Sequence, residues 1–148
     1  MSSTKTLPYE TTLLVRDCCL CLHVQRAARS LARRFDELLR PFGLTNGQFS
    51  LLMSLNRPEP PPMGPVATLL AMDRTTLTAA LKPLERRGLL KISPDPKDRR
   101  SRTLQLTAKG HALLIDATPV WEKAHREIEH TIPDGNPEAF RKVLRALS

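Results

Sequence analysis

The sequence is poor in several features that mark enzymes, secreted domains and membrane proteins. Aromatic residues make up 4% of its 148 positions, whereas leucine occurs 25 times. That composition favours a leucine-packed helical core over a β-sandwich. The three cysteines, Cys18, Cys19 and Cys21, are an odd number within four positions, which is not a disulfide framework and suits a reducing compartment. No apolar run approaches the ~18 residues that span a bilayer.

Catalytic motifs are missing as well. The chain has no Gly-rich phosphate loop, no serine nucleophile elbow, no His-Glu-x-x-His and no paired Cys-x-x-Cys. Its four histidines do not form a metal-ligand pattern, and its first residues lack the apolar segment of a signal peptide. We therefore expect a cytoplasmic protein that is not an enzyme, without cofactor, metal or membrane partner.

Positive charge is the first feature that the chain has in excess. Its formal net charge is +8, and residues 73–109, with ten Lys or Arg and four Asp or Glu, hold +6 of it. Such an excess predicts an anionic partner, with nucleic acid first and a membrane surface second. The clustering in one short segment favours nucleic acid.

Hydrophobic periodicity predicts a mainly helical chain. Helices are expected over about residues 11–40, 46–56, 63–71, 74–88, 108–131 and 137–147. Capping residues mark four of the starts: Thr45 with Gln48 at capping-box spacing, Asp73, Thr107, and Asn136 before a proline.

Two short strands are expected over Leu89–Ser93 and Thr103–Thr107, on either side of a turn-forming basic segment. Two helices joined by a tight turn and followed by a basic hairpin are typical of a winged helix-turn-helix, which binds DNA. The pattern therefore predicts a DNA-binding lobe.

Several motifs in this region resemble the MarR family of bacterial transcriptional regulators. They are Asp73-Arg74-Thr75-Thr76-Leu77-Thr78, Leu84-Glu85-Arg86-Arg87-Gly88-Leu89, Asp95-Pro96-Lys97-Asp98-Arg99-Arg100 and Leu106-Thr107-Ala108-Lys109-Gly110. The resemblance covers about residues 12–131. It implies a mainly α fold with a small two- or three-stranded β wing, and a homodimer held by N- and C-terminal helices. Residues 1–44 and 108–148 would form the dimerisation region, and residues 45–107 the winged helix-turn-helix lobe.

The resemblance also implies a function. Such a regulator binds a pseudo-palindromic operator in double-stranded DNA, usually as a repressor, and is released by a small-molecule effector. An architectural protein that binds DNA without sequence preference is the alternative that shares the basic hairpin.

The expected DNA contacts lie on two elements. On the 74–88 helix, small polar residues let the helix enter the major groove deeply. The expected contacts on this helix are the small residues Thr75, Thr76 and Thr78 and the cationic residues Arg74 and Lys82. On the hairpin, a thin arginine-rich tip suits the minor groove; its residues are Asp98, Arg99, Arg100 and Arg102. The resemblance implies that Asp98 pairs with Arg100 and that Arg100 enters the minor groove.

The family's effector pocket lies between the dimerisation helices and the DNA-binding lobe. Candidate lining residues here are His23, Phe49, Met53, Trp121 and His125. Simple core packing is the plainer interpretation for Phe49 and Met53.

Three interpretations of the cysteines stay open. They are small hydrophobic residues in a helix, a thiol sensor that uses Cys21 and Cys18, or a soft-metal site formed with His23. Contiguous helical cysteines fit the last one poorly. Cys21 lies fourteen residues before Phe35, a register that resembles the hydroperoxide-sensing branch of the family. That branch carries tyrosines where this chain has Phe35 and Asn46.

Overall fold

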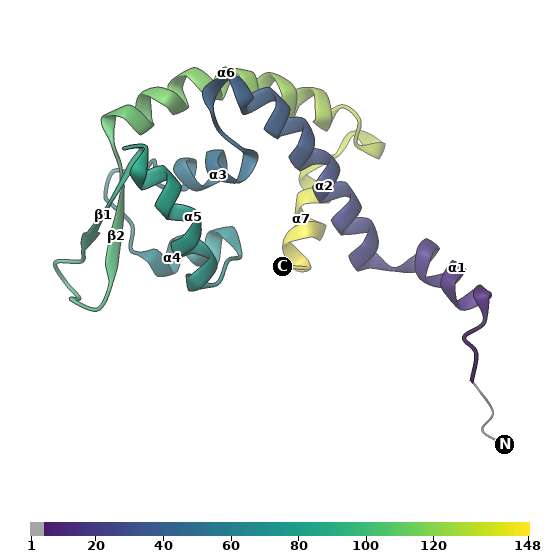
Figure 1. Ribbon diagram of the computed structural model, residues 1–148. Helices are drawn as coiled ribbons and strands as arrows, with labels where there is room; N and C mark the ends of the chain where they lie inside the picture. The colour runs from purple at the N-terminus through teal and green to yellow at the C-terminus, as the bar shows by residue number, and fades with distance from the viewer. Residues whose placement is uncertain (1–4) are drawn as a thin grey trace. The chain divides into compact units, whose positions relative to one another are not determined.

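The structure is a computed structural model that describes residues 5–148, and the chain divides into two compact units between Arg34 and Phe35. The first unit holds α1 (Tyr9–Cys18) and most of α2 (Leu20–Leu39), and the second holds the remaining elements (Figure 1). Among residues 5–148, no helix is long and apolar enough to cross a membrane.

The prediction of one continuous helix over residues 11–40 is wrong, because the helix is interrupted at Cys19. The backbone of Cys19 is extended (φ −70°, ψ 109°), and its thiol sulfur accepts a hydrogen bond from the backbone N–H of Leu22 at 3.4 Å. Cys19 thus occupies the place at the start of α2 where a serine or asparagine oxygen usually caps a helix. Apolar periodicity alone cannot reveal a break of one residue.

The second unit is helical apart from one hairpin. Its elements are η1 (Arg40–Phe42), α3 (Asn46–Ser54), α4 (Met63–Leu70), α5 (Arg74–Arg86), β1 (Leu90–Pro94), β2 (Arg102–Leu106), α6 (Ala108–Glu129), η2 (Pro133–Gly135) and α7 (Pro137–Ala146). The five helices predicted here start at the expected residues and end within two residues of the expected ends, and each strand is shifted by one residue. The expected fold class, mainly α with a two-stranded wing, is confirmed.

Side-chain caps explain why the first residues of these helices could be predicted from the sequence. Thr45 and Gln48 form both hydrogen bonds of a capping box at the start of α3. The side chains of Asp73, Thr107 and Asn136 accept backbone N–H groups in the first turns of α5, α6 and α7. These residues satisfy donors that the helices leave unpaired, so they fix the first residue of each element.

Leucine supplies most of the core, as the composition predicts. The fully buried leucines, each at 0% exposure, are Leu39, Leu52, Leu77, Leu81, Leu84 and Leu104. They come from α2, α3, α5 and β2, so one apolar cluster holds the helices and the hairpin together. Burial of each leucine side chain contributes about 1.5–3 kcal/mol to folding.

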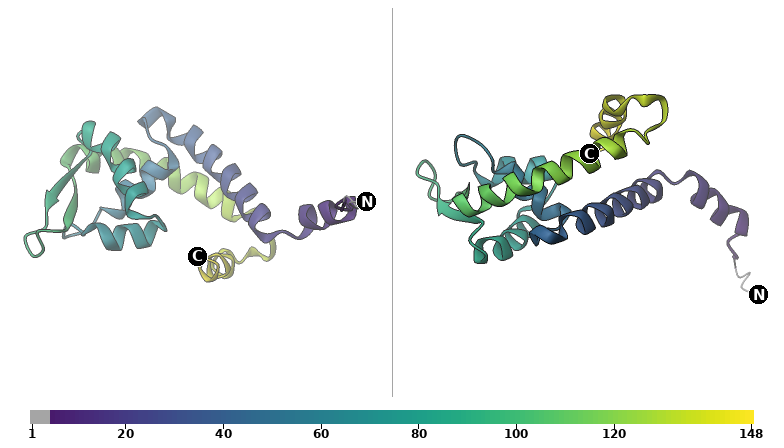
Figure 2. Two further views of the ribbon diagram at one scale, coloured as in Figure 1. Left: turned by 60° about the horizontal axis from the view of Figure 1, so that its bottom comes forward. Right: turned by 90° about the horizontal axis from the view of Figure 1, so that it is seen from above.

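The hairpin projects from this lobe, and its loop extends beyond the helices in all three views (Figures 1 and 2). Strands β1 and β2 pair antiparallel, with Leu90 opposite Leu106. The proline-rich connector before α4 runs along the other edge of β2. There the backbone N–H of Leu104 donates to the carbonyl of Pro61 at 2.9 Å, and Pro62 forms an isolated bridge with Thr103. The base of the wing is therefore held from both sides.

Charged side chains join the end of α6 to α7. Arg141 donates to Glu129 at 2.5 Å and to Glu138 at 3.0 Å, and Arg145 donates to Glu138 at 2.6 Å. The hydrogen bond from Arg141 lowers the pKa of Glu129. The opposite side of α7 carries an exposed apolar face, made up of Phe140, Val143, Leu144 and Leu147.

Candidate nucleic-acid interface

Helix α5 begins with a capped turn that sets its exposed face. The carboxylate of Asp73 accepts the backbone N–H of Thr76 at 2.7 Å, and this hydrogen bond lowers the pKa of Asp73. One turn later, the hydroxyl of Thr78 donates to the carbonyl of Arg74 at 2.7 Å. The Thr78 hydroxyl proton is thus used inside the helix, and its methyl group and lone pairs remain for a partner.

The predicted recognition residues gather on one side of α5, while Leu77, Leu81 and Leu84 bury the other side. A shallow hollow of about 320 Å³ lies on the exposed side and is lined by Arg74, Thr75, Thr78, Ala79 and Lys82. Four of the five predicted residues line it; the fifth, Thr76, is exposed but lies outside it. Ala79 also lines it, as the helical spacing predicts for a residue on the open face of α5.

The loop of the hairpin is shaped by two aspartates. Asp95 accepts the backbone N–H of Lys97 at 2.9 Å, and Asp98 accepts the backbone N–H of Arg100 at 3.0 Å. The expected pairing of Asp98 with Arg100 therefore occurs through the backbone of Arg100. Within residues 5–148 no ion pair holds the Arg100 guanidinium, so its charge faces solvent.

Three of the ten basic side chains between residues 73 and 109 donate to backbone carbonyls. Arg102 donates locally to Ser101 at 3.4 Å, whereas Arg87 and Lys109 donate to residues far away along the chain. Arg87 donates through Nη1 to the carbonyl of Gly43 at 2.7 Å. Lys109 donates through Nζ to the carbonyl of Arg87 at 2.8 Å. The sequence counts both as part of a DNA-facing charge, but their donors bind backbone oxygens.

Close packing joins the start of α6 to the hairpin base. A Cβ atom on Gly110 would lie 2.1 Å from the carbonyl oxygen of Leu89, a distance that requires the backbone to move. Beside it, the hydroxyl of Thr107 donates to the carbonyl of Gly88 at 2.7 Å and accepts the N–H of Gly110 at 3.0 Å. This junction fixes the direction in which the wing leaves the lobe.

Four of the predicted effector residues, Phe49, Met53, Trp121 and His125, belong to the second unit. Trp121 stacks between Phe49, at 5.9 Å between ring centroids, and His125, at 4.6 Å. Their rings fill space between α3 and α6, which agrees with core packing. Met53 lines a separate hollow of about 270 Å³. His23 belongs to the first unit, where its Nδ1 lies 2.8 Å from the carbonyl of Cys19.

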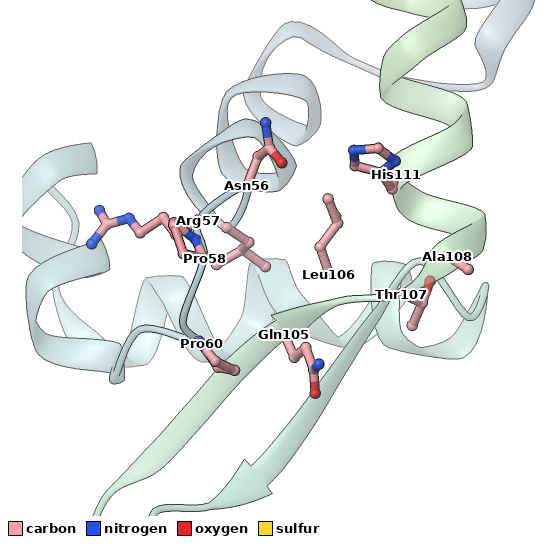
Figure 3. Close-up of a pocket in the computed structure, with 10 residues that line it drawn as sticks. Asn56, Arg57, Pro58, Pro60, Gln105, Leu106, Thr107, Ala108 and His111 are labelled. Atoms are coloured by element: carbon pink, nitrogen blue, oxygen red, sulfur yellow. The ribbon is translucent and has the colours of Figure 1, made fainter.

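A third hollow lies between the connector and the start of α6 (Figure 3). Its volume is about 380 Å³, and Asn56 and His111 face each other across it above Leu106. Both residues also line the hollow that contains Met53. The sequence offered no signal for Asn56, and it counted His111 only as a histidine outside a metal pattern.

The cysteines carry no disulfide; Cys18 and Cys21 are exposed and Cys19 is half-buried. The sulfur of Cys21 accepts a hydrogen bond from the side-chain amide of Gln25 at 3.1 Å. Activated thiolates are usually placed beside a cation, whereas this partner is uncharged. In the described part of the chain, no three His, Cys, Asp or Glu side chains are grouped to hold a metal ion.

A capped helix with an exposed polar face, followed by an arginine-tipped hairpin on the same leucine core, defines the winged helix-turn-helix class. A profile of the MarR family matches residues 44–101, the segment that holds α3 to the hairpin loop. The transcriptional regulator PecS of Dickeya dadantii is 31% identical over 127 residues, which cover 84% of this chain and 74% of PecS. The chain belongs to the MarR family of transcriptional regulators.

Solved structures support the same conclusion. MosR of M. tuberculosis in complex with DNA has a TM-score of 0.77 and 36% identity, covering 86% of this chain and 92% of that one. The repressor CouR bound to a 23-mer DNA duplex has a TM-score of 0.78 and 28% identity, covering 97% and 99%. CouR from Rhodococcus jostii RHA1 bound to p-coumaroyl-CoA has a TM-score of 0.76 and 25% identity, covering 88% and 92%.

Proposed function

We propose that this chain is a homodimeric, sequence-specific DNA-binding repressor whose hold on its operator is relieved by a small-molecule effector. The observation that carries the proposal is the pairing, on one leucine core, of the exposed face of α5 with the arginine tip of the hairpin. The DNA complexes of MosR and CouR support this use of the fold. The proposal includes no catalytic step for this chain, and it includes a cytoplasmic location.

In this proposal α5 enters the major groove. Arg74, Thr75, Thr78 and Lys82 line its exposed hollow and would contact base edges and phosphates, and Thr76 would reach a phosphate from beside it. The wing would place Arg99 and Arg100 at the adjacent minor groove, where negative potential attracts guanidinium groups. Arg102 would contact the sugar-phosphate backbone of the DNA. The winged lobe would span residues 45–107.

Dimerisation is assigned to residues 1–44 and 108–148. The exposed apolar face of α7 supports this, because Phe140 and Leu147, at 45% and 61% exposure, would be costly to leave in water as part of a contiguous patch. A two-fold dimer would place two α5 helices about one DNA turn apart, which matches a pseudo-palindromic operator.

Release by a small molecule is the part of the proposal supported by CouR with p-coumaroyl-CoA. The effector of this chain would bind better to a dimer whose α5 helices are misplaced for DNA, and would thereby lower DNA affinity by linkage. Oxidation of Cys21 is not favoured over this mechanism, because its sulfur has an uncharged partner.

Selection of binding sites from random duplex DNA tests the proposal directly. The purified dimer should enrich a two-fold-related sequence, and that sequence should compete far better than unrelated DNA of equal length. Equal competition by both DNAs would support the architectural alternative and reject the regulator. Oxidant treatment of Cys21→Ser provides the second test: release by oxidant in the wild type only would assign the switch to the thiol.

A further inference from the structure

Two hydrogen bonds tie the end of α5 to elements on either side of the DNA-binding lobe. The Arg87 guanidinium donates to the carbonyl of Gly43 at 2.7 Å, immediately after η1. Lys109, in the first turn of α6, donates to the carbonyl of Arg87 at 2.8 Å. Residue 87 is therefore bonded through its side chain to residue 43 and through its backbone to residue 109. We call these two bonds the Arg87 latch.

The Gly43 end of the latch is shaped to receive the guanidinium. Gly43 has φ +66°, the left-handed conformation that glycine adopts without strain. Its N–H donates back to the carbonyl of Arg40 at 2.8 Å, which turns its own carbonyl outward. A Cβ atom at this position would lie 3.0 Å from Nη2 of Arg87. The missing side chain thus allows the close approach.

The neighbouring arginine provides a contrast. Arg86 and Arg87 are both exposed, but within residues 5–148 no hydrogen bond or ion pair engages the guanidinium of Arg86. Arg86 and Arg87 carry equal charge one residue apart, but only the guanidinium of Arg87 is directed at backbone.

We propose that Arg87 is a positioning residue: through the latch it sets the angle at which α5 is presented to the operator, and it does not contact DNA. The inference rests on the proposed function. An α5 that is held at Gly43 and at Lys109 meets the major groove in one orientation. An α5 released at this end keeps its charge pattern but loses the fit to one sequence.

The test compares Arg87→Gln with Arg86→Gln on the selected operator and on unrelated duplex DNA, over a range of salt concentrations. Glutamine is uncharged and too short to reach Gly43. For Arg87→Gln we expect operator binding to weaken about tenfold or more beyond the loss on unrelated DNA, with the salt slope unchanged. For Arg86→Gln, lost charge should weaken binding to both DNAs by a similar factor. If Arg86 contacts a phosphate, the slope of log K against log salt concentration should become shallower by about 0.9 in Arg86→Gln.

Two results would overturn the proposal that Arg87 is a positioning residue. One is Arg87→Gln behaving like Arg86→Gln, with a reduced salt slope and equal losses on both DNAs, which would make Arg87 a phosphate contact. The other is wild-type operator preference in Arg87→Gln. Arg87→Lys, which keeps a cationic donor, should recover part of the preference. A wild type with no preference would reject the proposed function itself and this inference with it.

A melting curve of each variant separates loss of the contact from loss of structure. All binding is measured well below each variant's Tm. A lowered Tm with unchanged preference would assign Arg87 to stability alone and overturn the proposal. If Arg87→Gln fails to fold, Lys109→Met breaks the latch from α6 and must show the same loss.

Discussion

The tip and the base of the wing are built from opposite kinds of residue, although they belong to one hairpin. At the base, Leu90 and Leu104 are 2% and 0% exposed, and β2 is held by β1 on one edge and by the connector on the other. At the tip, Asp98, Arg99 and Arg100 are all exposed, and aspartate side chains bonded to backbone N–H groups set the loop.

This difference separates the residues of the wing that stabilise the lobe from those that bind DNA. Substitutions at the base should change the stability of the lobe, because they remove buried contacts. Substitutions at the tip should change binding to DNA and leave stability alone, because they remove no buried surface. The same division applies to the basic residues: Arg87 and Lys109 bind backbone carbonyls, whereas Arg100 faces solvent.

The largest effect is expected at the base, from Leu104→Ala. Leu104 is fully buried, and truncation of a buried leucine lowers the free energy of unfolding by about 2–5 kcal/mol. Urea denaturation measures the loss. The exposed neighbour Gln105→Ala serves as the control and should unfold like the wild type. A Leu104→Ala protein of wild-type stability would contradict the assignment of the base to the core.

At the tip, Arg100→Ala should weaken operator binding about tenfold or more, since a single arginine contact to DNA is worth about 1–3 kcal/mol. Its urea midpoint and its dimeric state should stay as in the wild type. Fluorescence anisotropy on the selected operator gives the affinity, and sedimentation gives the assembly state. Near-normal operator binding would remove the wing tip from the interface.

A smaller effect is expected from Asp98→Ala, which shapes the tip without a proposed DNA contact of its own. Loss of the acceptor for the Arg100 N–H loosens the loop, and operator binding should weaken a few-fold, in line with one hydrogen bond of about 0.5–1.5 kcal/mol. Asp98→Asn keeps an acceptor oxygen and should retain most of the affinity. An Asn variant as weak as the Ala variant would show that the charge matters and the loop geometry does not.

The smallest effect is expected on stability at acidic pH, through the Asp73 cap of α5. The hydrogen bond from Thr76 lowers the folded-state pKa of Asp73 below its ordinary value of 3.8. The cap therefore contributes fully at neutral pH, and its contribution is lost as the pH falls from about 4 through the folded-state pKa. Asp73→Asn caps without titrating, so its urea midpoint should match the wild type at pH 7 and fall less steeply below pH 4. If the urea midpoints of the wild type and Asp73→Asn fall equally steeply below pH 4, Asp73 is not a source of the acid sensitivity.

Much of the lobe could be predicted because its signals are local. Asp73, Thr107 and the Thr45–Gln48 pair act on N–H groups within three residues of themselves, so the helix starts follow from short motifs. The exposed face of α5 follows from leucines at helical spacing. The break at Cys19 was missed because it depends on one residue's ψ angle and one sulfur contact.

The predicted effector pocket depends on packing between residues far apart in the sequence. His23, Phe49, Met53, Trp121 and His125 were selected for chemistry at long separations, and in the structure three of them stack while Met53 lines a separate hollow. Which side chains surround empty space depends on how whole elements pack, and a linear pattern carries little information about that.

By itself, the sequence determined the helical fold class, the helix starts and the basic segment between residues 73 and 109, because propensity, capping and charge act over a few neighbouring residues. The tertiary structure alone decided which of those charges are free. Arg87 finds its acceptor 44 residues away at Gly43, and Lys109 finds its acceptor 22 residues away at Arg87. Such contacts exist only once α5, η1 and α6 have packed on a shared core, and until then every cation in the segment is equivalent.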